Sequence, residues 1–216
     1  MARTRFHHGD LTNALIDAAV ELLEAGDASV LTLREVARRA GVTSGAPYHH
    51  FPTRADLFAA VATRGFMALG EAIEASQRRA GTPVQRFERR MLAYLSFARA
   101  HPAHYRVMFH PEIRGSGSHE AHAAISRAAF DQLVDGVRAV RPDLAELALR
   151  QLALTTWAAA HGLVTLSLDG YVEGLAGSST KATLEECAAH LTTMLETASG
   201  PRARASSRSR EGQPPG

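Results

Sequence analysis

The segment from Gly41 to Arg54 reads GVTSGAPYHHFPTR and gathers a tyrosine, two histidines and an arginine into one short stretch. Hydroxyl, imidazole and guanidinium groups hydrogen-bond to phosphate oxygens, and small residues such as Thr43 and Ser44 fit against the edges of nucleic-acid bases. If the segment only filled a core, each of these polar atoms would need a buried partner. The composition of the segment therefore favours a surface that faces a polyanion.

Two helices are predicted before this segment. In the first, apolar residues from Ile16 onward recur at the spacing of one helical face, between Asp10 as the expected N-cap and Gly26 as the stop signal. In the second, Thr32 followed by Glu35 has the pattern of a capping box, in which each side chain satisfies a backbone N–H at the other's position. These signals predict that both helices end before the polar segment.

A glycine turn then leads to a short third helix. Gly41 can take a positive φ angle without steric cost, and Thr43 or Ser44 is the expected cap of the helix that carries the polar residues. Pro47 is tolerable because it lies in the first turn, where backbone N–H groups have no intrahelical partner. The three elements together predict a helix-turn-helix.

Residues 11–58 resemble the DNA-binding domain of the TetR family of transcriptional regulators. The resemblance rests on TLREVARRAGV from Thr32, on YHHF from Tyr48 and on the basic Arg54, although the family commonly has Leu or Ile in place of Pro47. It implies an all-α, nine-helix TetR-like fold. The expected divisions are a helix-turn-helix DNA-binding domain with a basic arm at 1–54 and a helical ligand-binding and dimerisation domain at 55–199. The stretch at 200–216 lacks large apolar residues, so a disordered tail is expected there.

The polar residues have two expected roles at DNA. The Tyr48 hydroxyl and the Arg54 guanidinium suit phosphate oxygens, whereas the small residues at the start of the third helix face base edges in the major groove. His49 is the best candidate for a further contact, and His50 is expected to support the turn. Surface histidines without a role and a solvated Arg54 are the alternatives. The predicted DNA-binding residues are Thr32, Thr43, Ser44, Gly45, Ala46, Tyr48, His49 and Arg54.

The chain beyond the polar segment has the pattern of a larger helical domain. Breaks rich in glycine, proline and serine divide it into expected helices at about 54–80, 83–100, 102–110, 118–140, 143–168 and 183–198. With the three amino-terminal helices, the expected count is nine.

The last two long helices carry more apolar surface than one neighbour can cover. The predicted helix at 143–168 is apolar on more than one side, and the final helix has an uninterrupted apolar stripe. The resemblance implies a homodimer joined by a four-helix bundle made from these two helices of each subunit. An ordinary monomer core is the alternative. The predicted interface residues are Leu184, Ala188, Leu191 and Leu195.

An aromatic residue and a titratable residue share one face of the 143–168 helix. Trp157 and His161 stand at i and i+4, and Gly162 follows them. This Trp-x3-His-Gly pattern is similar to that of a TetR subgroup. The pair is interpreted either as a wall of an inducer pocket or as core, in which case His161 bonds a backbone carbonyl. The predicted pocket residues are Tyr94, Phe97, Phe130, Trp157 and His161.

Composition excludes several classes of protein. A chain of 216 residues with 45% hydrophobic content can bury a sizeable core, and polar residues interrupt its longest apolar run, so no membrane partner is expected. Cys187 is the only cysteine, which indicates a cytoplasmic protein without an internal disulfide. No histidine spacing predicts a metal site, no catalytic constellation is recognisable, and no cofactor is expected.

The sequence therefore favours a cytoplasmic, homodimeric, ligand-responsive regulator that is not an enzyme. The expected partners are a double-stranded DNA operator and an unknown small-molecule effector. A repressor that an inducer releases from a pseudo-palindromic operator fits best. The alternative is a small-molecule-binding helical protein without an operator-specific function.

Overall fold

The computed structural model describes residues 8–26, 31–115, 117–176 and 179–198. Within these ranges the chain forms nine α-helices and two 3-10 helices and has no strand, which confirms the all-α fold. No helix in them is long and apolar enough to cross a membrane. The predicted basic arm and the tail at 200–216 lie outside the described residues.

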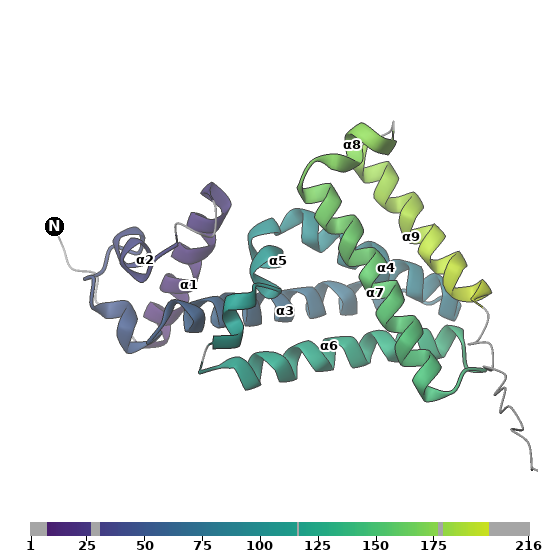
Figure 1. Ribbon diagram of the computed structural model, residues 1–216, viewed down its shortest axis with the longest axis horizontal. Helices are drawn as coiled ribbons and strands as arrows, with labels where there is room; N and C mark the ends of the chain where they lie inside the picture. The colour runs from purple at the N-terminus through teal and green to yellow at the C-terminus, as the bar shows by residue number, and fades with distance from the viewer. Residues whose placement is uncertain (1–7, 27–30, 116, 177–178, 199–216) are drawn as a thin grey trace, which may run out of the picture.

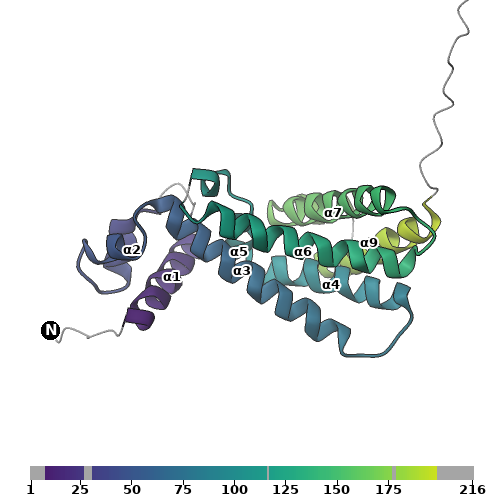
Figure 2. The same cartoon turned by 90° about the horizontal axis from the view of Figure 1, so that it is seen from below.

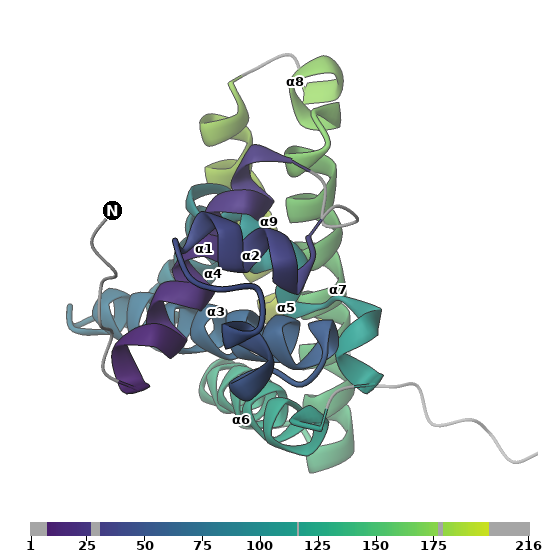
Figure 3. The ribbon, with the colours of Figure 1, turned by 90° about the vertical axis from the view of Figure 1, so that its left-hand side faces the viewer.

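The amino-terminal helices form one end of the molecule (Figure 1). Their bounds are α1 (His8–Ala25), α2 (Leu33–Arg39) and the 3-10 helix η2 (Ala46–His49). α1 and α2 pack together through fully buried residues such as Leu15, Ala19 and Val36. Seen from that end, these helices lie in front of the larger helical body (Figure 3). The expected N-cap Asp10 was misplaced, because α1 begins at His8 and Asp10 lies inside it.

The long helix α3 (Arg54–Gln77) joins this end to the rest of the chain (Figure 1). A complete capping box starts it, since the Thr53 side chain accepts from the Asp56 backbone and Asp56 accepts from the Thr53 backbone. The first turns of α3 carry fully buried residues such as Leu57, Phe58 and Val61. Its length then packs against three further helices, α4 (Pro83–Ala100), α5 (Pro102–Met108) and α6 (His119–Val140).

The carboxy-terminal helices lie at the end of the molecule away from α1 and α2 (Figure 2). After α5 and the 3-10 helix η3 (Pro111–Gly115), the chain continues through α6 into α7 (Glu146–Leu168), α8 (Tyr171–Ala176) and α9 (Thr180–Thr197). α9 packs against both α4 and α7, and one contiguous core extends from α1 to α9.

Three predictions about elements need correction. The third helix is a 3-10 helix with Gly45 as its N-cap and without a side-chain cap from Thr43 or Ser44; Pro47, which has no N–H, occupies its first turn. α8 lies in a stretch that the sequence indicates as a glycine-rich break. The number of α-helices matches the expected nine, but the set differs, because the expected third helix is a 3-10 helix and α8 is an additional one.

The predicted dimer stripe is also corrected. Leu184, Ala188 and Leu195 are buried within the chain, and Leu191 is half-buried against the same core. The physical reason is that α9 turns its most apolar face toward α4 and α7 of its own chain. The exposed large apolar residues of these elements are instead Leu147, Leu154 and Leu166 on α7 and Met194 on α9.

Candidate DNA-binding surface and ligand cavity

The turn between α2 and η2 has the geometry that the sequence predicts. Gly41 has a φ of 71°, and the backbone N–H of Val42 donates to the Ala37 carbonyl at 3.0 Å, which closes the end of α2. Thr32 caps the start of α2 by accepting from the Glu35 backbone at 3.2 Å. The Glu35 carboxylate accepts from Arg38 instead, so only the Thr32 half of the predicted capping box is formed.

Most of the predicted DNA-binding residues lie on the surface. Pro47 is buried against α2 and anchors η2, which leaves the residues on either side of it free to face outward. Tyr48 is 49% exposed although it is an aromatic residue. Ala46 and Arg54 are half-buried, and the exposed residues are Thr32, Thr43, Ser44, Gly45, Tyr48 and His49.

Gly45 is not required by the fold of the chain itself. Its φ of −85° is open to any residue, and no atom lies within 4 Å of the position that a Cβ would take. A partner that approaches the backbone closely is a physical reason for a glycine at such a position.

His50 and Arg54 both have partners within the chain. The Nδ1 atom of His50 lies 2.9 Å from the Thr12 hydroxyl of α1, which agrees with its predicted role in supporting the turn. The Arg54 guanidinium lies 3.6 Å from the Glu112 carboxylate of η3 and 4.8 Å from the centre of the Phe58 ring. Arg54 therefore bridges the start of α3 and η3.

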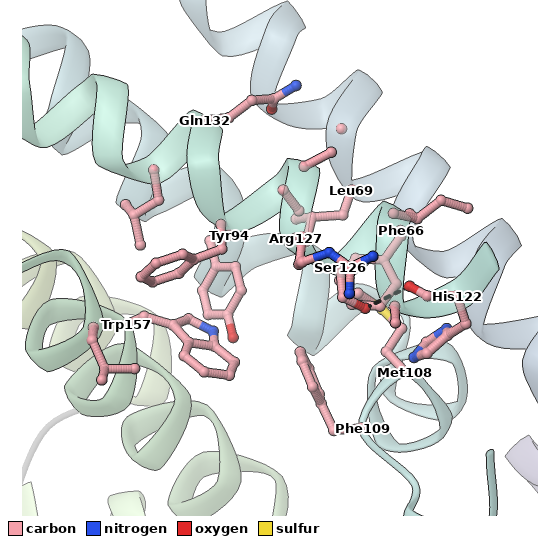
Figure 4. Close-up of a pocket in the computed structure, with 18 of the residues that line it drawn as sticks. Phe66, Leu69, Tyr94, Met108, Phe109, His122, Ser126, Arg127, Gln132 and Trp157 are labelled. Carbon is pink, nitrogen blue, oxygen red and sulfur yellow. Dashed lines mark hydrogen bonds between the residues drawn. The ribbon is translucent and has the colours of Figure 1, made fainter. Parts of the chain in front are cut away.

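A cavity of about 910 Å³ lies among α3, α4, η3, α6 and α7. Figure 4 shows Tyr94 and Trp157 at one end of it and Phe66, Met108 and His122 at the other. Phe109 and Leu69 line the space between these two groups. A concave, largely apolar space of this size, with a few polar groups, is typical of a small-molecule site.

The structure brings three of the five predicted pocket residues to this cavity. Tyr94, Phe130 and Trp157 line it. His161 lines a separate cleft of about 190 Å³ beside Tyr105. Phe97 lines neither space, because it is buried in the core with its ring centre 4.9 Å from that of His101.

A hydrogen-bonded chain links the cavity wall to the cleft. The hydroxyls of Tyr94 and Tyr105 lie 2.9 Å apart, and the Tyr105 hydroxyl lies 2.6 Å from Nδ1 of His161. Burial raises the pKa of both tyrosines and lowers the pKa of His161, so the neutral forms are favoured. His161 thus bonds a tyrosine rather than the backbone carbonyl of the core interpretation.

Family models match both halves of the chain. The model described as bacterial regulatory proteins, tetR family, matches residues 15–61, and the model described as tetracyclin repressor-like, C-terminal domain, matches residues 87–191. The chain joins a TetR-family helix-turn-helix domain to a TetR-like carboxy-terminal domain. The Trp-x3-His-Gly subgroup stays a prediction, because neither description names it. A search of curated proteins found no match.

Solved structures share the fold over most of the TetR-like chain. A protein with unknown function from Rhodococcus sp. RHA1 is 28% identical with a TM-score of 0.71, covering 88% of this chain and 98% of its own. A TetR-like transcriptional regulator from the same organism is 16% identical with a TM-score of 0.65, covering 88% and 97%. A TetR-family transcriptional regulator from Streptomyces coelicolor is 23% identical with a TM-score of 0.64, covering 88% and 82%.

The 3-10 helix η3 contacts both the cavity and the TetR-family helix-turn-helix domain. His110, just before η3, lines the cavity, while its ring centre lies 4.7 Å from that of Phe58 in the first turns of α3. Just after η3, the Gly117 backbone donates to the Asp56 carboxylate at 2.8 Å. Hydrogen bonds from Thr53 and then from this backbone hold the pKa of Asp56 below its usual value, so the carboxylate stays charged.

Sequence reasoning missed several residues of the cavity. Phe66 of α3, Phe109 after α5 and Arg90 of α4 line it together, but they come from elements that only folding brings together. No local motif in the sequence marks them. Contacts between distant elements were the information that the sequence lacked.

Proposed function

We propose that the protein is a homodimeric transcriptional repressor that leaves a pseudo-palindromic DNA operator when a small molecule fills the cavity. The observation that carries this proposal is the position of η3 and its flanking residues. They line the cavity on one side and hold Arg54, Asp56 and Phe58 at the start of α3 on the other. A ligand that displaces η3 would therefore change the placement of the helix-turn-helix.

The energetics of this coupling follow from two conformations of the dimer. A ligand shifts this equilibrium toward release only to the extent that it binds the released conformation more tightly than the DNA-binding conformation. Arg54 is a contact that can differ between them, because its guanidinium can face either Glu112 or a DNA phosphate. Pairing with Glu112 in the released state would remove one cation from the DNA surface.

The proposed DNA surface is formed by the exposed residues around η2. Thr43 and Ser44 are small enough to approach base edges in the major groove, and Tyr48 presents its hydroxyl for a phosphate. Gly45 supports this role, because the space around it is open and the fold does not require a glycine there.

Dimerisation is proposed through α7 and α9. Leu147 is 69% exposed and Met194 is 64% exposed, and Leu154 and Leu166 add to the apolar surface of α7. Two copies of the chain are needed because a pseudo-palindrome presents half-sites about 34 Å apart, which one recognition element cannot span.

The test is recovery of the bound DNA. Genome-wide pull-down with the full chain should enrich one palindromic sequence, and a labelled fragment carrying it should resist competition by random DNA. Ser44→Glu, which places a negative charge against the proposed groove, should abolish this binding. Ala139→Glu, which places the same charge on an exposed position of α6, should not. Enrichment of no sequence would overturn the proposal and favour a small-molecule-binding protein without an operator.

A further inference from the structure

The described lining of the cavity has basic side chains but no acidic ones. It includes four arginines and three histidines, but no aspartate or glutamate. The arginines are Arg90, Arg114, Arg127 and Arg150. A largely apolar cavity that concentrates cationic groups attracts anions, because few water molecules screen the charges there.

The four arginines differ in how far the chain already neutralises them. Arg150 lies 2.9 Å from the Asp131 carboxylate and stacks on Phe130, so its charge is compensated. Arg114 and Arg127 are exposed and form no ion pair with described residues, so they add uncompensated positive charge to the lining.

Arg90 is the arginine that the chain leaves least satisfied. It is half-buried, and its guanidinium makes no hydrogen bond or ion pair with the described part of the chain. Burial and then repulsion by Arg86 lower its pKa, and attraction by Asp135 only partly offsets them. An anion placed beside it would stabilise the charged guanidinium.

We propose that the cavity binds an amphipathic organic anion, whose apolar body lies among the aromatic side chains and whose anionic group faces Arg90. This inference rests on the proposed function, because it assigns a chemical class to the effector of the same cavity. Phe66, Tyr94, Phe109 and Trp157 form the apolar surface for the body. The planar guanidinium of Arg90 can bind two oxygens of a carboxylate, a sulfonate or a phosphate at once.

A second unsatisfied polar group also lines the cavity. Nδ1 of His122 is buried and has no hydrogen-bond partner in the described structure. Burial lowers the pKa of this histidine, so its ring is held in the neutral form. A neutral ring offers a hydrogen bond without adding a second charge, which suits a hydroxyl or amide on the ligand body. Arg90 is therefore the proposed partner of the anionic group, and His122 the proposed polar contact of the body.

Two fluorescent probes with the same apolar body test the inference without DNA. Anilinonaphthalene sulfonate carries an anionic group, and N-phenyl-naphthylamine is its neutral counterpart. The full chain should bind the sulfonate at least about tenfold more tightly, as expected for one charge-assisted contact in a cavity. Equal affinity, or tighter binding of the neutral probe, would overturn the inference.

Substitutions test whether Arg90 causes the preference for the anionic probe. Arg90→Gln should bring the two affinities close together by weakening only the sulfonate, and Arg90→Lys should keep most of the preference. Arg99→Gln removes the same charge from an exposed position of α4 outside the cavity and should leave the ratio unchanged. A preference that survives Arg90→Gln, in protein that still binds the neutral probe, would also overturn the inference. Failure of operator binding would not affect these affinities, so the two proposals are tested separately.

Discussion

Tyr105 is the residue through which the wall of the cavity is joined to His161. Tyr105→Phe would remove the hydroxyl that bonds both the Tyr94 hydroxyl and Nδ1 of His161. Because Tyr94 is buried and His161 is half-buried, we expect the free energy of unfolding to fall by about 1–3 kcal/mol. Urea denaturation measures this value, and Tyr171→Phe at an exposed tyrosine is the control. An equal effect of the two substitutions would show that the hydrogen-bonded chain does not stabilise the fold.

Tyr48 and Arg54 are expected to position the protein on DNA through phosphates. Tyr48→Phe removes one exposed hydroxyl, so it should weaken binding to specific and random DNA alike. Arg54→Ala should also lower the slope of log affinity against log salt by about one. Glu112→Gln is the informative companion, because it frees Arg54 from its ion pair and should strengthen DNA binding. Weaker binding with Glu112→Gln would indicate that the ion pair itself supports the DNA-binding conformation.

The placement of some of these residues could be predicted from the sequence, and that of others could not. Thr43 and Tyr48 could be placed on the surface because their neighbours in sequence form one local motif, whose turn is set by Gly41. His161 and Phe97 could not be placed, because the face of a helix that meets a cavity depends on which distant helices cover the other faces. Only the structure shows that Tyr105 stands between His161 and Tyr94.

At the scale of elements, two complete capping boxes allow a matched comparison. Thr53 with Asp56 starts α3, and Thr82 with Gln85 starts α4. Thr53→Ala and Thr82→Ala should each lower the free energy of unfolding by about 0.5–2 kcal/mol. Only Thr53→Ala should also weaken operator binding, because α3 begins beside the helix-turn-helix and Asp56 holds the Gly117 backbone. Calorimetry and a DNA titration of both variants check this, and equal loss of DNA affinity would contradict it.

The sequence predicts where helices begin better than it predicts which helices pack together. The starts expected at about 54 and 83 agree with those of α3 and α4, because capping is decided within one turn of the chain. The apolar stripe of α9 packs against α4 and α7 of its own chain, whereas the resemblance to the TetR family assigns it to a second subunit. Periodicity reveals that Leu184 and Leu195 need cover, whereas the identity of the cover depends on tertiary packing.

At the scale of the whole molecule, half-buried histidines link stability to pH. Burial is the largest cause of a lowered pKa for His104, His122 and His161. The unfolded chain then binds more protons than the folded one as the pH falls below about 6.5, so the free energy of unfolding is highest above this pH and decreases below it. Melting temperatures measured between about pH 7.5 and about pH 5.5 should fall, and His122→Gln should reduce the fall. An unchanged pH dependence would mean that His122 titrates alike in both states.

Dimerisation is a property of the whole molecule, and charged substitutions at exposed apolar positions test it. Met194 on α9 and Met67 on α3 are 64% and 61% exposed, so a charge at either position leaves the core of the chain intact. Met194→Glu should give folded monomers without operator binding, because it places two carboxylates in the proposed α7–α9 interface, where desolvation is unfavourable. Met67→Glu should leave the dimer unchanged. Leu195→Glu should unfold the chain, because that side chain is buried within the subunit. Sedimentation velocity and circular dichroism distinguish these outcomes, and a DNA-competent Met194→Glu dimer would place the interface elsewhere.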